Sequence, residues 1–359
     1  MALAVVWSHS FAIYRGSEAT EPISLLLNGT YDAGKIGVLV FFVISGYLIC
    51  QSYDHHKNNF KFFEKRVRRI YPGYLVTTSI CAFIVIPIFA QHYDLSAVQI
   101  IKTLGLNLLL KNYFPPSDVF GSGVINGSLW SIPFEFWCYI GIAAMGSIGL
   151  FKIRWSVPFI VVIVMALRVW LDLTGRKPGG GIVEFIIGWQ YTWFSVLPCF
   201  LAGTTLYLFR DAVRRNGLVA LLGIAALLAV AHLPGDGVYR QIVTNLVFVP
   251  TIAYATICLA FSPTFALHNA ARFGDFSYGT YLYAYTIQLI ILNVAPDLSF
   301  AAYVLVCIVA SLVAGITSWY CVERWFLIAR HHRFSRRLIS SNVFGRDRLN
   351  QKSNAGSPT

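Results

Sequence analysis

Long apolar runs separated by short polar segments dominate the chain. Ten such runs fall near residues 1–14, 36–52, 73–91, 129–150, 155–172, 192–209, 217–233, 242–262, 277–294 and 301–322. A helix needs about 20 apolar residues to span a bilayer, and most of these runs reach or approach that length. Outside a barrel, a spanning segment must be helical because its backbone polar groups have to pair within the segment. The pattern therefore predicts an all-α integral membrane protein of about ten transmembrane helices.

The ends of the chain and its basic residues set the expected orientation. The first run is short for a span, so we expect a first helix truncated at its N-terminus and a true start upstream. A cytoplasmic N-terminus puts most of the 28 Lys and Arg residues in inside loops and in the tail, as the positive-inside rule favours. We expect a multi-pass protein of the bacterial inner (plasma) membrane with both termini cytoplasmic. Residues 329–359 are expected to form a basic, partly disordered cytoplasmic tail.

The amino-acid composition indicates that lipid surrounds the protein. Hydrophobic residues make up 57% and charged residues only 12% of the chain, whereas soluble domains carry about 25% charge. The net charge of +12 could indicate nucleic acid, but the basic residues lie in short clusters between apolar runs, which argues against that partner. The seven cysteines form no CxxC pair and no HExxH spacing occurs, so no metal site is expected.

Two titratable residues lie within or beside apolar runs on the side expected to face away from the cytoplasm. His9 is in the outer half of the first run, where an ionisable group is costly and is a functional candidate by default. Glu135 starts the fourth run at the same expected depth, where a carboxylate can orient an imidazole. The alternatives are a packing histidine and a water-facing glutamate. Arg168 and Asp172, four residues apart, are expected to neutralise each other.

The second run and the loop after it carry a further pattern. Arg66 and Arg69 share one face of a helix, and their guanidinium groups suit the phosphates of a nucleotide-bearing donor. The alternative is a topogenic cluster that contacts anionic lipid. Gly37, Ser45 and Gly46 allow either a ligand or another helix to approach closely.

Six short strings follow one another along nearly the whole chain. They are ALAVVWSHS with His9, GKIGVLVFFVISGYLI, RVRRIYP with Arg66 and Arg69, SLWSIPFEFWCY with Ser128, Trp130 and Glu135, FGDFSYGTYLY with Tyr278 and Tyr281, and VERWF. In this order they resemble the motifs of the acyltransferase-3 family of membrane O-acyltransferases. Each string alone is weak, whereas six in sequence at suitable topological positions are a specific signal.

The resemblance implies a transmembrane acyltransferase domain over residues 1–328 that transfers groups other than aminoacyl groups. The reaction would move an acyl group, usually acetyl, from cytoplasmic acyl-CoA to a hydroxyl of a glycan or lipid-linked saccharide. Acyl-CoA is then a co-substrate, and no cofactor is permanently bound. The implied catalytic pair is His9 with Glu135, the implied donor-binding residues are Arg66, Arg69, Gly37, Ser45 and Gly46, and the further candidates are Ser128, Trp130, Tyr278 and Tyr281.

Two departures from the family pattern and two other functions remain to be weighed. The arginine of the family's first motif would fall three residues before Met1, and Ala284 stands where many members carry a histidine. A transporter or flippase of a glycan or lipid intermediate would also suit about ten helices with a few buried polar groups. That function predicts paired broken helices in two related halves, which the sequence pattern does not show. A non-catalytic membrane scaffold is the third possibility.

Overall fold

The computed structural model describes residues 1–56, 58–121, 123–262 and 274–328, which form a helical protein without a strand in those ranges. The expected tail, 329–359, lies outside the described residues. The helices are α1 (Ala2–Arg15), α2 (Pro22–Leu26), α3 (Ala33–His56), α4 (Asn59–Ile80), α5 (Ile86–Phe89), α6 (Ala97–Leu108), α7 (Ser131–Ser147), α8 (Ser156–Thr174), α9 (Gly181–Ile187), α10 (Gln190–Leu208), α11 (Gly217–Ala231), α12 (Gly237–Ala260), α13 (Ser277–Val294), α14 (Phe300–Ser318) and α15 (Arg324–Ile328).

Each of the ten apolar runs contains a helix, as the sequence predicts. In the described part of the chain, six helical stretches are long and apolar enough to cross a membrane, and they contain α3, α4 with α5, α8, α9 with α10, α12, and α14 with α15. Helices α1, α7 and α11 are shorter than these, with 14, 17 and 15 residues. The fold is therefore an all-α, multi-pass membrane protein, and a total of ten crossings stays a prediction.

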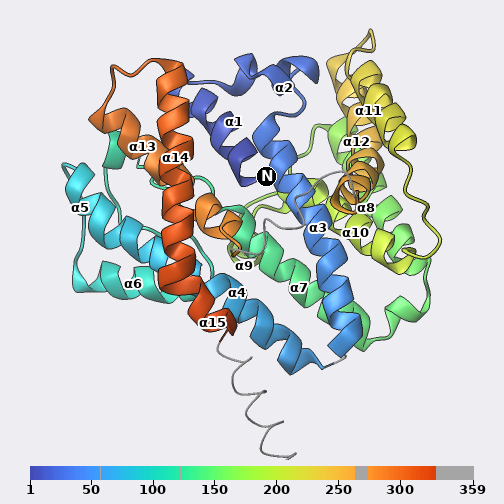
Figure 1. Ribbon diagram of the computed structural model, residues 1–359, viewed down its shortest axis with the longest axis horizontal. Helices are drawn as coiled ribbons and strands as arrows, with labels where there is room; N and C mark the ends of the chain where they lie inside the picture. Colours follow the sequence, from blue (N-terminus) through green and yellow to red (C-terminus); the bar gives the residue numbers. More distant parts are fainter. Residues whose placement is uncertain (57, 122, 263–273, 329–359) are drawn as a thin grey trace, which may run out of the picture.

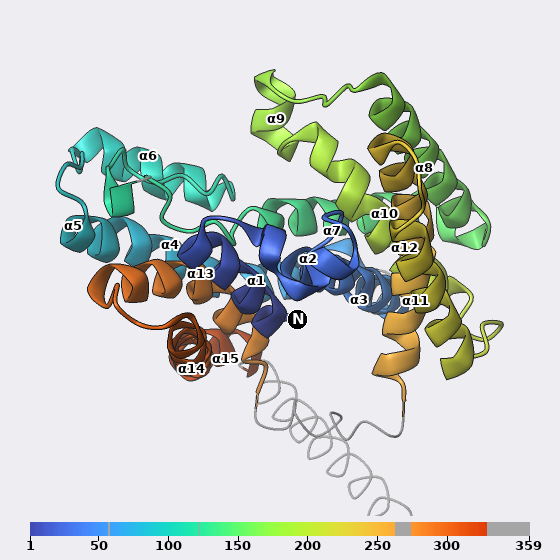
Figure 2. The same cartoon turned by 90° about the horizontal axis from the view of Figure 1, so that it is seen from above.

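Helix α3 runs through the middle of the molecule and organises the rest. In Figure 1 it crosses the centre, with α13 and α14 to one side and α8, α10, α11 and α12 to the other, and Figure 2 shows the same separation from above. It packs against α1, α7, α10 and α12. Helix α1 in turn contacts α13 and α14, so the first helix joins the central helix to the C-terminal pair.

The contact between α3 and α10 depends on two glycines that let the backbones approach. A Cβ atom added at Gly46 would lie 1.9 Å from the carbonyl oxygen of Phe200, and one added at Gly203 would lie 1.9 Å from that of Val43. The Thr204 hydroxyl donates to the Gly46 carbonyl at 3.2 Å. Small residues with a threonine hydrogen bond are a common way to join helices in lipid, and here they fix α3 beside α10.

A buried carboxylate fixes the start of α3 beside α1. Glu21, which is fully buried, accepts a hydrogen bond from the Trp7 indole at 2.9 Å and one from the Ser24 backbone N–H at 2.8 Å. It also lies 3.4 Å from the Ala33 backbone N–H. Three segments that are apart in the sequence thus share one acceptor. This clamp sets the position of α1, and with it the position of His9.

The segment 92–128, which holds none of the ten apolar runs, contains helix α6 and a hydrogen-bonded turn. Helix α6 exposes the apolar side chains of Val98 and Ile101. Asp118 accepts hydrogen bonds from the backbone N–H groups of Gln91 and His92, both at 2.9 Å. These bonds, with the His92 ring, hold the pKa of Asp118 below its usual value. The segment is therefore folded against the helices.

We predict that Gly46→Ala destabilises the protein by about 1–3 kcal/mol, because the added methyl group meets the α10 backbone and not a side chain that could move. The thermal midpoint in detergent should fall. Gly141→Ala is the matched control, since a Cβ at that helical position in α7 meets nothing within 4 Å. Equal midpoints for the two variants would contradict the assigned role of Gly46.

Candidate functional site

Two cavities lie next to each other beside α3. The large cavity has a volume of about 1190 Å³ and is lined by His9, Asp32, Trp130 and residues of α8 to α10. The small cavity has a volume of about 120 Å³ and is lined by Arg69, Glu135, Tyr278 and mostly apolar neighbours. Val5, Val38 and Tyr281 line both. These three side chains, from α1, α3 and α13, therefore form the boundary between the two spaces.

His9 lines the large cavity from α1, and the carboxylate residue Asp32 lines the same cavity. The Ser8 hydroxyl donates to Asp32 Oδ1 at 2.6 Å, and Asp32 lies close enough to His9 to act on it electrostatically. The ring stands edge-on to Tyr285, with centroids 5.1 Å apart. Its Nδ1 atom is buried without a hydrogen-bond partner among the described residues. Because His9 lines the cavity, its imidazole is a candidate to accept a proton from a bound hydroxyl.

Charged and aromatic side chains share the wall of the large cavity. Lys35 donates from Nζ to the Thr30 carbonyl at 3.1 Å. Arg168 forms the expected ion pair with Asp172, with Nε at 2.8 Å from Oδ2. Burial and the neighbouring Asp32 carboxylate raise the pKa of Glu18. The aromatic lining residues, whose faces suit the apolar faces of sugar rings, are Tyr113, Trp130, Phe134, Phe185, Trp189, Tyr191 and Tyr281.

The segment 92–128 contributes a strained turn to this wall. Leu110 and Asn112, both lining residues, have positive φ angles of 57° and 49°. The Asn112 side chain accepts from the Tyr74 hydroxyl at 2.8 Å and donates to the Leu129 carbonyl at 3.0 Å. Backbone strain held in place by surrounding bonds is common at ligand sites. Here it presents Lys111 to the large cavity.

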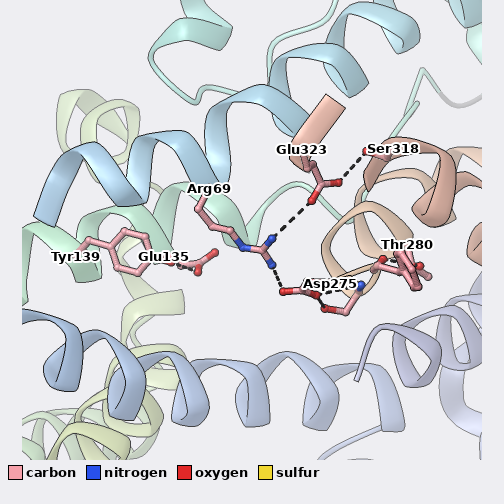
Figure 3. A network of polar contacts seen from close by, with 9 residues as sticks. Arg69, Glu135, Tyr139, Asp275, Thr280, Ser318 and Glu323 are labelled. Carbon is pink, nitrogen blue, oxygen red and sulfur yellow. Dashed lines mark hydrogen bonds and ion pairs between the residues drawn. The ribbon is translucent and has the colours of Figure 1, made fainter. Parts of the chain in front are cut away.

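Arg69 lies beside the small cavity at the centre of a charged network. Figure 3 shows its guanidinium between Glu135 on one side and Asp275 and Glu323 on the other. It forms ion pairs with Asp275 Oδ2 and, at 3.6 Å, with Glu323 Oε2. Glu323 is buried and also accepts from the Ser318 hydroxyl at 2.8 Å. Arg69 thus connects α4 to the start of α13 and to the π-helical stretch Trp319–Glu323 that joins α14 to α15, and its charge is already compensated.

Arg66, one turn earlier on α4, keeps more of its binding capacity. Its NH2 atom is 3.3 Å from the Ser52 hydroxyl, and its guanidinium lies 5.8 Å from the centre of the Tyr139 ring. The Nε atom is buried without a hydrogen-bond partner, and no ion pair of Arg66 occurs among the described residues. The two arginines that the sequence treats alike therefore differ: one is paired with carboxylates and the other is not.

Glu135 lies with the arginines, and the structure shows no contact between it and His9. The Tyr139 hydroxyl donates to Glu135 Oε1, and Arg69 and Arg66 lie close enough to act on the carboxylate. Glu135 lines the small cavity while His9 lines the large one. The carboxylate beside His9 is Asp32, a residue that the sequence pattern did not single out.

The other predicted site residues divide between the cavities and the packing around them. Gly37 and Tyr278 line the small cavity, Trp130 lines the large one, and Tyr281 lines both. Ser128 is buried, and its carbonyl accepts from the Tyr281 hydroxyl. Ser45 and Gly46 are absent from the lining of both cavities, and Gly46 serves the contact with α10. Ala284 is buried against Val6, Tyr303 and Cys307.

Several cavity residues could not be found from spacing alone. Asp32 and Lys35 flank the start of α3, where they look like ordinary helix-start residues. Arg168 was assigned only an ion pair, which is present, but it also lines the large cavity. Glu323 belongs to the VERWF string, so that string was a usable signal for a partner of Arg69.

Comparisons with known proteins agree with this architecture. The acyltransferase domain family matches residues 1–319. An O-acetyl transferase of Shigella phage Sf6 is 30% identical over 91% of this chain and 93% of its own length. Nodulation protein 10 of Rhizobium leguminosarum bv. viciae is 27% identical over 40% of this chain and 42% of its own length. No solved structure matches the chain. With its family's domain spanning nearly all of its length, this chain belongs to the acyltransferase-3 family and is an acyltransferase of groups other than aminoacyl groups.

Proposed function

We propose that the protein moves an acyl group, acetyl in the simplest case, from acyl-CoA to a hydroxyl of a glycan or lipid-linked saccharide. The observation that carries this proposal is the pair of adjoining cavities. One is lined by His9 and seven aromatic side chains, and the other is lined by Arg69, one turn along α4 from Arg66. A sugar fits the first by its polar and apolar faces, and the thioester of a phosphate-bearing donor fits the second.

In the proposed reaction, His9 accepts the proton of the acceptor hydroxyl as its oxygen attacks the thioester carbonyl carbon. The new C–O bond replaces the C–S bond, and the coenzyme A thiolate leaves and takes up the proton from the imidazolium. The products are an O-acyl ester and free coenzyme A. Asp32, rather than Glu135, is the carboxylate placed to stabilise the imidazolium.

The donor's phosphates are assigned to Arg66 because it forms no ion pair among the described residues and its Nε atom has no hydrogen-bond partner there. Arg69 is assigned to positioning, since Asp275 and Glu323 already hold its guanidinium. Glu135, which accepts a hydrogen bond from Tyr139, lines the small cavity together with Arg69 and makes that part of its wall polar.

We predict that His9→Ala lowers acyl transfer by about 10²–10⁴-fold, because the general base is lost. Membranes holding the protein would be incubated with radiolabelled acetyl-CoA and a cell glycan fraction, and base-labile label on glycan would be counted. His232→Ala is the control, since this exposed residue is outside both cavity linings. A fully active His9→Ala protein that is present at normal level would refute the catalytic role.

Arg66→Ala and Arg69→Ala should impair the protein differently, the first in donor binding and the second in stability. The first removes charge-assisted hydrogen bonds to the donor, so KM for acetyl-CoA should rise about 10-fold or more. The second leaves buried Glu323 without its cation and should lower the free energy of unfolding by about 3 kcal/mol. Breaking a fully buried pair costs about 3–5 kcal/mol, and the lower value applies because the Arg69 side chain is 25% exposed.

The measurements are donor KM and thermal midpoint in detergent, with Arg68→Ala as the control because its pair with Glu64 is partly exposed. In the double variant Arg69→Met with Glu323→Gln, the midpoint should recover in part. If Arg69→Ala alone raises KM and leaves the midpoint unchanged, the division between the two arginines is wrong.

A further inference from the structure

We propose that Val5, Val38 and Tyr281 limit the length of the acyl group that the enzyme accepts. The inference rests on the proposed function, because it takes the small cavity as the place where the thioester end of the donor lies. Nothing in the family match or in the relatives' names assigns a length limit to these positions.

The small cavity has room for only a short group. Its volume is about 120 Å³, and an engineered protein cavity of about 150 Å³ accommodates one benzene molecule, which has six heavy atoms. By that comparison the small cavity holds about five heavy atoms. The acyl carbons, carbonyl oxygen and sulfur of an acetyl thioester make four, those of a butyryl thioester make six, and those of a hexanoyl thioester make eight. Acetyl therefore fits, butyryl is marginal and hexanoyl does not fit.

The boundary side chains are held in ways that oppose widening. Val5 and Val38 are buried on α1 and α3, and β-branched side chains in a helix have one strongly preferred rotamer. The Tyr281 hydroxyl donates to the Ser128 carbonyl and accepts from Ser131 Oγ at 2.7 Å. Both ends of the tyrosine are thus fixed, because α13 holds its backbone and α7 with the segment before it holds its hydroxyl.

The same three side chains face the large cavity, so the reacting carbonyl has to come up to this boundary to meet the acceptor. With the acceptor in the large cavity, a longer acyl chain has to bend back into the small cavity, whose other walls include the buried side chain of Ile132 and the ring of Tyr278. A close-packed wall does not expand without cost. The boundary therefore limits how many carbons the acyl chain can carry beyond its carbonyl.

The test compares acetyl-, butyryl- and hexanoyl-CoA as donors for the full-length protein in membranes, with kcat/KM measured for each. We expect the kcat/KM of wild type to be at least about 10-fold higher for acetyl-CoA than for hexanoyl-CoA. A mismatch of only about one methylene already changes kcat/KM by about 10–200-fold. Val38→Ala should lower that ratio at least fivefold, and Val5→Ala provides the same test from α1 if the first variant is poorly produced.

Val43→Ala is the matched control, since it removes the same atoms from a buried position of α3 that lines neither cavity. It should leave the acetyl-to-hexanoyl ratio unchanged. Equal use of acetyl and hexanoyl donors by wild type, or equal ratios in Val38→Ala and Val43→Ala, would overturn the length limit and leave the transfer reaction intact. Absence of transfer from every donor would instead refute the proposed function, and the length limit with it.

Discussion

A charged guanidinium inside a lipid-covered helical protein needs carboxylate partners. The partners of Arg69 determine how α4, α13 and the end of α14 are placed. Desolvating an ion costs several kcal/mol, which opposite charges and hydrogen bonds have to offset. Asp275 and Glu323 supply the opposite charge from the start of α13 and from the π-helical stretch after α14. The same interaction that neutralises Arg69 (Figure 3) therefore fixes where α13 begins. Helix α13 carries Tyr278 and Tyr281, which line the small cavity.

The boundary between the cavities follows from this arrangement. Helix α3 touches both spaces, because Lys35 and Leu39 line only the large one, Gly37 and Phe41 only the small one, and Val38 lines both. Helix α1, clamped through Glu21, adds His9 on one side and Val5 on the boundary. The cavity-facing residues of α1 and α3 thus separate the large cavity, which His9 lines, from the small cavity, which Arg69 lines.

The sequence predicted the helical architecture well because lipid leaves a spanning chain few alternatives. Every apolar run proved to contain a helix, and the Arg168–Asp172 pair is formed. The prediction failed where the outcome depends on how helices meet. Matching expected depths put Glu135 near His9, but the structure places Glu135 with Arg69 and Tyr139, and Asp32 with His9. Helix α6 was missed because it lies in a segment with mixed polar and apolar residues.

The most direct measurement is a cryo-electron-microscopy structure of the protein in lipid nanodiscs with a non-transferable thioether analogue of acetyl-CoA. The account predicts phosphate density at Arg66, the acetyl end in the small cavity against Val38 and Tyr281, and the imidazole of His9 across that boundary. Analogue density that stays outside the small cavity, or that reaches the large cavity by another route with Val5, Val38 and Tyr281 untouched, would contradict it.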